Sequence, residues 1–185
     1  MRGGAKAGDT VSVDLIRDGE PTTVEVKLSR KPPEDYLIDP YMFDRGPRYV
    51  IFGGLIFQEL TLPYLESWGE DWPNRAPFKL VYANANPESY EEEGRKKLVF
   101  LSNVLKTPST LGYESLTSAI LTEVNGKTIT NIQDLADALS ETPEGGIHTI
   151  EFNDFPKIIY VDDTSSRFVN EQLIQYGINK LERLE

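Results

Sequence analysis

Apolar and polar residues alternate strictly in the first part of the chain, through residues 11–15 and again through residues 24–28. Period-two alternation gives a strand one apolar face, and Asp18-Gly19 between the two runs supplies residues that tolerate positive φ in a tight turn. This pattern predicts a β-hairpin. Because an isolated hairpin is only marginally stable, we expect it either to dock on the later part of the chain or to be the remnant of a domain that begins upstream.

A second apolar run, residues 49–57, is interrupted by the pair Gly53-Gly54. It is too short to cross a membrane and rich in β-forming residues, which predicts a buried strand entered through a tight loop. The composition also changes at residues 31–35, Lys-Pro-Pro-Glu-Asp, which reads as a linker. Further strands are predicted at residues 97–102, 119–124, 147–152 and 157–161.

Helical periodicity is clearest after the turn Asn125-Gly126, where apolar residues recur at helical spacing over residues 132–139, with Asn131 as the N-cap. Shorter helices are predicted at residues 62–68 and 87–93. A last helix is expected to begin near Thr164 or Ser165 and to end at Gly177. We expect it to carry four apolar side chains inward, those of Phe168, Val169, Leu173 and Ile174. This combination of short strands and a few helices predicts an α+β fold with a small, partly open β-barrel or sandwich.

Charge and composition exclude several functions. The 185 residues carry a formal net charge of −11, which disfavours nucleic acid and anionic membranes as ligands. The absence of Cys excludes disulfides, thiolate metal sites and cysteine nucleophiles. The sequence has no apolar run of about 18 residues, so we expect no transmembrane helix. We therefore expect no cofactor and no metal site.

The titratable residues give little indication of catalysis. His148 is the only histidine and lies in an alternating segment, where a solvent-facing or hydrogen-bonded side chain is the ordinary role. The adjacent Asp162 and Asp163 are interpreted as a solvated turn, because neighbouring residues on a strand point to opposite faces and the spacing of a calcium loop is missing.

Several segments in collinear order resemble one family. A strand, the Asn125-Gly126 turn, a helix with Leu135 and Leu139 four apart, and a terminal strand resemble the second half of a PDZ domain. Three further segments narrow the resemblance to one group of PDZ domains: Phe52-Gly53-Gly54-Leu55-Ile56-Phe57, Leu62-Pro63-Tyr64-Leu65 and Gly112-Tyr113-Glu114. These resemble the C-terminal PDZ-like domain of Do-like (HtrA/Deg) serine proteases.

The resemblance implies an organisation in three parts. Residues 1–34 look like the last hairpin of a preceding PDZ domain plus a linker, residues 35–162 like the PDZ-like domain, and residues 163–185 like a C-terminal helix and tail. The chain lacks the trypsin-like catalytic motifs of the family, so we expect it to be no enzyme itself, with proteolysis in another part of the parent protein. The compartment cannot be read from the residues; only the family resemblance points to the periplasm or an organelle.

PDZ domains bind a peptide as an added strand beside a sheet edge and a helix, with a glycine-rich loop receiving its terminal carboxylate. By resemblance, the loop is Phe52, Gly53, Gly54 and Leu55, the edge strand is Leu55, Ile56 and Phe57, and the helix wall is Ile132, Ala136 and Leu139. The expected partners are peptide or unfolded-protein segments or other subunits of the same protease, in a homo-oligomer. The alternative is an oligomerisation or scaffold domain whose groove is permanently occupied.

Overall fold

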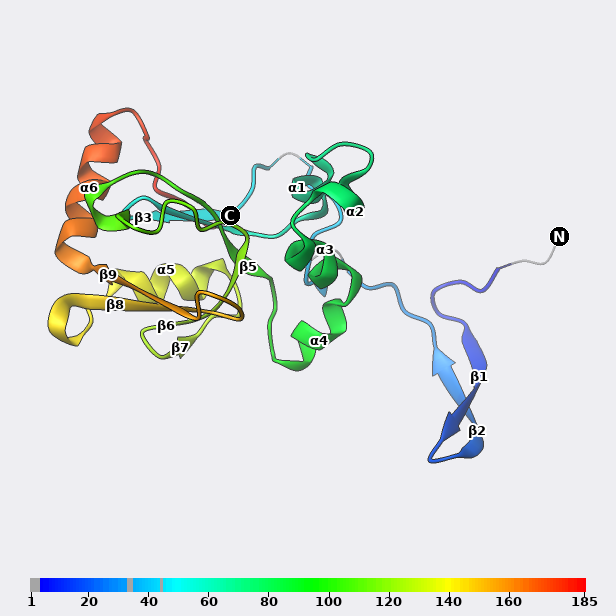
Figure 1. Ribbon diagram of the computed structural model, residues 1–185. Helices are drawn as coiled ribbons and strands as arrows, with labels where there is room; N and C mark the ends of the chain where they lie inside the picture. Colours follow the sequence, from blue (N-terminus) through cyan, green and yellow to red (C-terminus); the bar gives the residue numbers. More distant parts are fainter. Residues whose placement is uncertain (1–3, 33–34, 44) are drawn as a thin grey trace. The chain divides into compact units, whose positions relative to one another are not determined.

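The computed structural model describes residues 4–32, 35–43 and 45–185, which form two compact units, Met1–Asp35 and Tyr36–Glu185 (Figure 1). The boundary between the units falls at the segment interpreted as a linker, in which Pro33 and Glu34 lie outside the described residues. The assignment of the first unit to a preceding PDZ domain stays a prediction.

The first unit is the predicted hairpin. Strand β1 (Thr10–Arg17) pairs antiparallel with β2 (Glu20–Lys27), and the turn between them has positive φ at Asp18 (53°) and Gly19 (86°). The apolar face stays open: Val13 and Val26 are 40% and 41% exposed. The hairpin is therefore held by its strand ladder and turn, with little apolar burial of its own.

The second unit is built on one antiparallel sheet, with strands in the order β10-β3-β4-β5-β6-β8-β9 and with β7 paired to β6. Its strands are β3 (Tyr49–Phe52), β4 (Leu55–Glu59), β5 (Val99–Val104), β6 (Ala119–Val124), β7 (Lys127–Thr128), β8 (Ile147–Phe152), β9 (Ile158–Asp162) and β10 (Glu182–Arg183). The predicted strands 119–124 and 147–152 are confirmed residue for residue. The apolar run 49–57 forms two strands, β3 and β4, where one was expected.

Helices cover this sheet in two groups, with α1 to α4 together at one end and α5 and α6 nearer the other (Figure 1). They are α1 (Leu62–Glu66), α2 (Trp72–Arg75), α3 (Phe78–Ala85), α4 (Pro87–Glu92), α5 (Ile132–Ser140) and α6 (Asp163–Gln175). Helix α5 begins as predicted, with the Asn131 side chain accepting a hydrogen bond from the amide of Asp134. Helices α2 and α3 were not predicted: α2 has only four residues, too few to show a helical period, and α3 follows Pro77, which cannot provide a side-chain cap.

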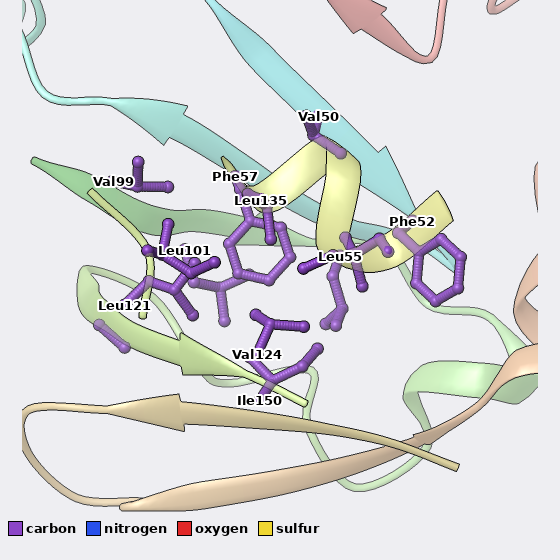
Figure 2. Close-up of a cluster of buried hydrophobic side chains, with 14 of the residues drawn as sticks. Val50, Phe52, Leu55, Phe57, Val99, Leu101, Leu121, Val124, Leu135 and Ile150 are labelled. Atoms are coloured by element: carbon purple, nitrogen blue, oxygen red, sulfur yellow. The ribbon is translucent and has the colours of Figure 1, made fainter. Parts of the chain in front are cut away.

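Strand β5 separates two hydrophobic cores. Its alternate side chains point to opposite faces, so Val99 and Leu101 enter a core beneath α5, while Phe100 enters a second core beneath α1 and α3. In the first core Leu135 of α5 lies beside Phe57 of β4 (Figure 2). Each fully buried side chain of this size stabilises the fold by roughly 1.5–3 kcal/mol.

Helix α6 departs from its predicted facing. Val169 is buried as expected, but Phe168 is 59% and Ile174 49% exposed, so the inward facing predicted for these two is wrong. Asp163, interpreted from the sequence as part of a solvated turn, is the buried first residue of the helix. Only its neighbour Asp162 is exposed, and it caps α6 by accepting a hydrogen bond from the amide of Ser165.

A buried hydrogen-bond network joins β8 to α6. His148 is completely buried, with Nε2 2.8 Å from Asp163 Oδ1 and Nδ1 2.9 Å from Asn125 Nδ2. The Asn125 amide nitrogen also donates to the carbonyl of Ala138, and its oxygen accepts from the amide of Thr149. His148 Nδ1 therefore accepts, which assigns the proton of the neutral ring to Nε2 and makes it a donor to Asp163.

Asp163 gains a clear preference for its charged form from this network. Burial raises the pKa of its carboxyl, but hydrogen bonds from Arg167, His148 and Thr142 outweigh burial and lower the pKa to about 2. A carboxyl whose pKa falls on folding stabilises the folded state above its ordinary pKa, and this contribution is lost as the pH falls through the folded-state value.

We predict that Asp163→Asn destabilises the protein by on the order of 1–2 kcal/mol near neutral pH. The difference from the wild type should shrink as the pH falls from 3.8, the ordinary pKa, to about 2, because the wild type loses its charged carboxylate over that range. Urea unfolding at several pH values measures this. Asp137→Asn, on the exposed side of α5, is the control and should show little loss at any pH.

The turn that joins β3 to β4 has no room for a side chain. Gly54 has φ of +102°, and a Cβ there would lie 2.7 Å from Cγ2 of Thr107 and 3.2 Å from the carbonyl of Leu105. Gly145 also has positive φ, +80°, but a Cβ there would meet nothing within 4 Å. A comparison of substitutions at the two glycines therefore separates the cost of the positive-φ backbone from the cost of a steric collision.

Gly54→Ala should therefore destabilise the fold more than Gly145→Ala. Both variants incur roughly 1–2 kcal/mol for the left-handed backbone. We expect Gly54→Ala to lose a further 1–3 kcal/mol, roughly, from overpacking against Thr107. Urea unfolding midpoints of the two variants measure the difference, and equal losses would show that the turn has more space than its contacts indicate.

Candidate functional site

The strand expected to offer a free edge lies inside the sheet. β4 pairs antiparallel with β3 on one side and with β5 on the other. The expectation that Leu55, Ile56 and Phe57 form an edge strand is therefore wrong. The residues before the glycine pair are themselves apolar and β-forming, and the tight turn folds them back onto β4, where contacts with α5 and α6 hold them.

The Gly53-Gly54 loop is occupied by the protein's own side chains. The amide of Gly53 donates to Asn170 Oδ1 of α6 at 2.9 Å, and its carbonyl accepts from the hydroxyl of Thr107 at 2.7 Å. A Cβ on Gly53 would lie 2.5 Å from the hydroxyl of Ser166, so the loop packs directly on α6. In this arrangement the Gly53 amide is not free for a peptide carboxylate.

Strand β3 takes the place that an added strand was expected to take. It runs antiparallel beside β4 and packs against α5. Its side chains Val50 and Phe52 enter the first core with Leu135 of the helix (Figure 2). Leu139 belongs to the same core. The groove between β4 and α5 is thus filled by the chain itself.

A pocket of about 330 Å³ remains between β3, α5, α6 and the C-terminal segment. Its apolar lining consists of Val50, Ile51, Phe52, Ala136, Leu139, Ile174 and Leu181. Three of the predicted site residues, Phe52, Ala136 and Leu139, are brought together here. Three others are excluded from the surface by burial: Leu55 and Phe57 are 0% exposed and Ile132 is 1% exposed.

The outer edge of β3 is covered by β10, which the sequence analysis missed. Glu182 lies opposite Val50 and Arg183 opposite Tyr49, and the amide of Ile51 donates to the carbonyl of Leu181 at 2.7 Å. Two paired residues are too few to produce a recognisable alternation. No local signal in the sequence could have identified this strand.

Arg167 holds the wall of the pocket in place. Its Nε donates to both carboxylate oxygens of Asp163, at 2.9 and 3.0 Å, and its Nη2 donates to the carbonyls of Leu139 and Ser140 at the end of α5. The guanidinium thereby joins α5 to α6. Its Nε and Nη2 are committed to these partners, and apolar residues make up most of the pocket lining.

The other end of α5 is fixed by a buried carboxylate. Glu59 of β4 accepts a hydrogen bond from the amide of Ile132, the first residue of the helix, at 3.0 Å. Burial raises the pKa of Glu59, while this hydrogen bond and the positive charges of Arg48 and Lys97 act in the opposite direction. Helix α5 is thus anchored to β4 at its first residue and to α6 at its end, which fixes the walls of the pocket.

The site holds groups suited to packing and strand pairing. Within the described residues no cluster of three or more His, Cys, Asp or Glu side chains is arranged to bind a metal ion. In the same part of the chain, no helix is both long and apolar enough to cross a bilayer. The arrangement consists of the short β10 pairing along β3 and a pocket beside it in which apolar residues outnumber polar ones.

Comparison with known proteins identifies the fold. The model of the PDZ domain family matches residues 38–181. The chain is similar to Protease Do-like 2, chloroplastic, of Arabidopsis thaliana, with 34% identity over 131 residues that cover 70% of this chain and 20% of the relative.

Two further relatives share more distant similarity. One is the putative protease Do-like 3, mitochondrial, of Arabidopsis thaliana, which is 24% identical over 170 residues, 92% of this chain and 27% of the relative. The other is a serine protease DegP homolog of Plasmodium falciparum, 27% identical over 134 residues, 72% of this chain and 14% of the relative. The chain thus spans well under a third of the length of these relatives.

The α+β architecture, the extent of the family match and the relatives agree with the resemblance read from the glycine pair, the Asn125-Gly126 turn and the helix after it. The chain belongs to the PDZ domain family, and its PDZ domain is homologous to regions of the Do-like serine proteases.

Proposed function

We propose that this chain is the non-catalytic, regulatory PDZ module of a Do-like serine protease and that it binds an extended polypeptide segment by strand addition at the outer edge of β3. The observation that carries the proposal is the position of β3. It fills the groove between β4 and α5, so strand addition moves to its own outer edge, beside a partly apolar pocket. The two paired residues of β10 cover that edge, and a bound segment would take their place. Binding by strand addition is a general mode of PDZ domains.

Proteolysis belongs, in this proposal, to a part of the parent protein other than these residues. The relatives are named as proteases, and the chain aligns with only 14–27% of the length of the three similar proteins. The one histidine cannot serve as a general base here, because it is completely buried and both ring nitrogens are engaged, by Asn125 and Asp163.

The geometry also defines the chemistry of the segment that would bind. An apolar side chain would enter the pocket between Phe52, Ala136 and Leu139, and the backbone would pair with β3. Because the Gly53 amide already donates to Asn170, a free terminal carboxylate would gain nothing at that loop. An internal stretch of an extended chain should therefore bind as well as a C-terminus.

A second function is favoured by the same filling of the groove. If β10 never leaves β3, the module presents no open edge and acts as an oligomerisation or scaffold domain, positioning other parts of the protease within an assembly. This alternative places recognition on an outer surface of the domain. Peptide binding separates the two.

We predict saturable binding of a fluorescein-labelled octapeptide of alternating Leu and Ser, measured by fluorescence anisotropy. The free-acid and C-terminally amidated forms should bind equally well. Ala136→Glu should weaken binding at least tenfold, because it places a charge in the pocket, whereas Gln133→Glu, on the exposed side of the same helix, makes the same change in charge and should have no effect.

The experiment separates the alternatives completely. Absence of saturable binding to the wild type would overturn strand addition and leave the scaffold function. Binding that needs the free carboxylate, or that is equally weakened by both glutamate substitutions, would show recognition at a different place. Gly54 is avoided as a test position, because any side chain there collides with Thr107.

A further inference from the structure

The C-terminal strand β10 is attached by few contacts. It contributes two paired residues, and the segment adds a hydrogen bond from the hydroxyl of Tyr49 to the carbonyl of Lys180 at 3.1 Å. The Arg183 guanidinium lies 5.6 Å from the centre of the Tyr49 ring, and Leu184 packs at the margin of the first core. Apart from the packing of Leu184, these contacts join the last six residues to β3, a strand more than 120 positions earlier in the chain.

The segment between α6 and β10 consists of a hydrogen-bonded helix end followed by a short linker. The amide of Gly177 donates to the carbonyl of Ile174, and the amide of Ile178 donates to that of Leu173, which closes the end of the helix. Asn179 and Lys180 come next, in neither helix nor strand, with exposed side chains. Rotation of the backbone at these two residues would redirect β10 without disturbing α6.

We propose that β10 exchanges between two copies of this chain, so that the tail of each copy pairs with β3 of the other. This inference rests on the proposed function, since it uses the same edge of β3, and it names the segment that binds there. The structure indicates the occupant. The edge of β3 pairs with Glu182 and Arg183, the pocket accommodates Leu181, and any other copy of the chain carries the same strand. Exchange of an identical element keeps all contacts of the closed monomer and is a low-cost route to a dimer.

Exposed apolar side chains beside the hinge favour a second copy. Ile174 is 49% and Tyr176 84% exposed, and both lie within five residues of Asn179, the start of the hinge. Burial of these side chains between the two copies adds a contact that the monomer lacks. The net charge of −11 on each copy opposes association, so added salt should increase the dimer fraction.

Cysteine cross-linking tests the exchange directly, because the natural chain has no Cys. Tyr49 and Arg183 are opposite each other in the β3-β10 pair. Full-length Tyr49→Cys chains are mixed with tagged full-length Arg183→Cys chains and oxidised. Exchange predicts a disulfide-linked heterodimer several-fold more abundant than in a control mixture in which Arg183→Cys is replaced by Glu171→Cys, an exposed position on α6.

A second measurement uses no cysteine. Sedimentation velocity of the unmodified chain should show a dimer whose fraction rises with protein and salt concentration. A heterodimer yield no higher than the control, together with a monomer at all concentrations, would overturn the exchange. If the octapeptide still binds in that case, strand addition at β3 stands and only the identity of its partner is wrong.

Discussion

The pairing of β3 with β4 through the Gly53-Gly54 turn is the constraint on which the rest of the second unit depends. It places Val50 and Phe52 under α5, closes the groove between that helix and β4, and puts β3, whose outer edge is covered only by the two paired residues of β10, at this side of the sheet. The turn can be this tight only because neither glycine carries a side chain, with Ser166 on one side and Thr107 on the other. A local steric condition thus decides where another polypeptide can pair.

Buried polar groups complete this arrangement by fixing α5 and α6. Glu59 satisfies the first amide of α5, and Arg167 joins the end of the same helix to Asp163 at the start of α6. His148 is a partner of that carboxylate from β8. Each of these groups is buried or has several hydrogen-bond partners. Together they hold β4, α5, α6 and β8 in place and so fix the spacing of the pocket walls.

Strong local signals made most of the fold predictable. The Asn131 cap, the Asn125-Gly126 turn and the alternating hairpin each have a physical mechanism that acts within a few residues, and the structure confirms them. The pairing of β3 on β4 was not predicted, because an apolar run with two glycines is compatible with one strand after a loop or with two strands. Which alternative forms depends on contacts with α5 and α6 that are more than 70 residues away in the chain.

The candidate site was predictable in part for the same reason. Phe52, Ala136 and Leu139, which the resemblance to PDZ domains placed at the site, all line one pocket. Leu55, Phe57 and Ile132 have equally apolar side chains but point into the interior, and periodicity alone cannot distinguish a groove wall from a core. The residues of β10 were missed because their structure comes from pairing with β3, not from their own pattern.

Strand β5 has a consequence for how the second unit loses its structure. Its two faces belong to different cores, with Leu101 on one side and Phe100 on the other. Neither core can open without removing a wall of the other, so the group of short helices α1 to α4 and the sheet beneath α5 should melt as one cooperative body. The four short helices α1 to α4 therefore share the stability of the sheet, although they form a separate group beside it.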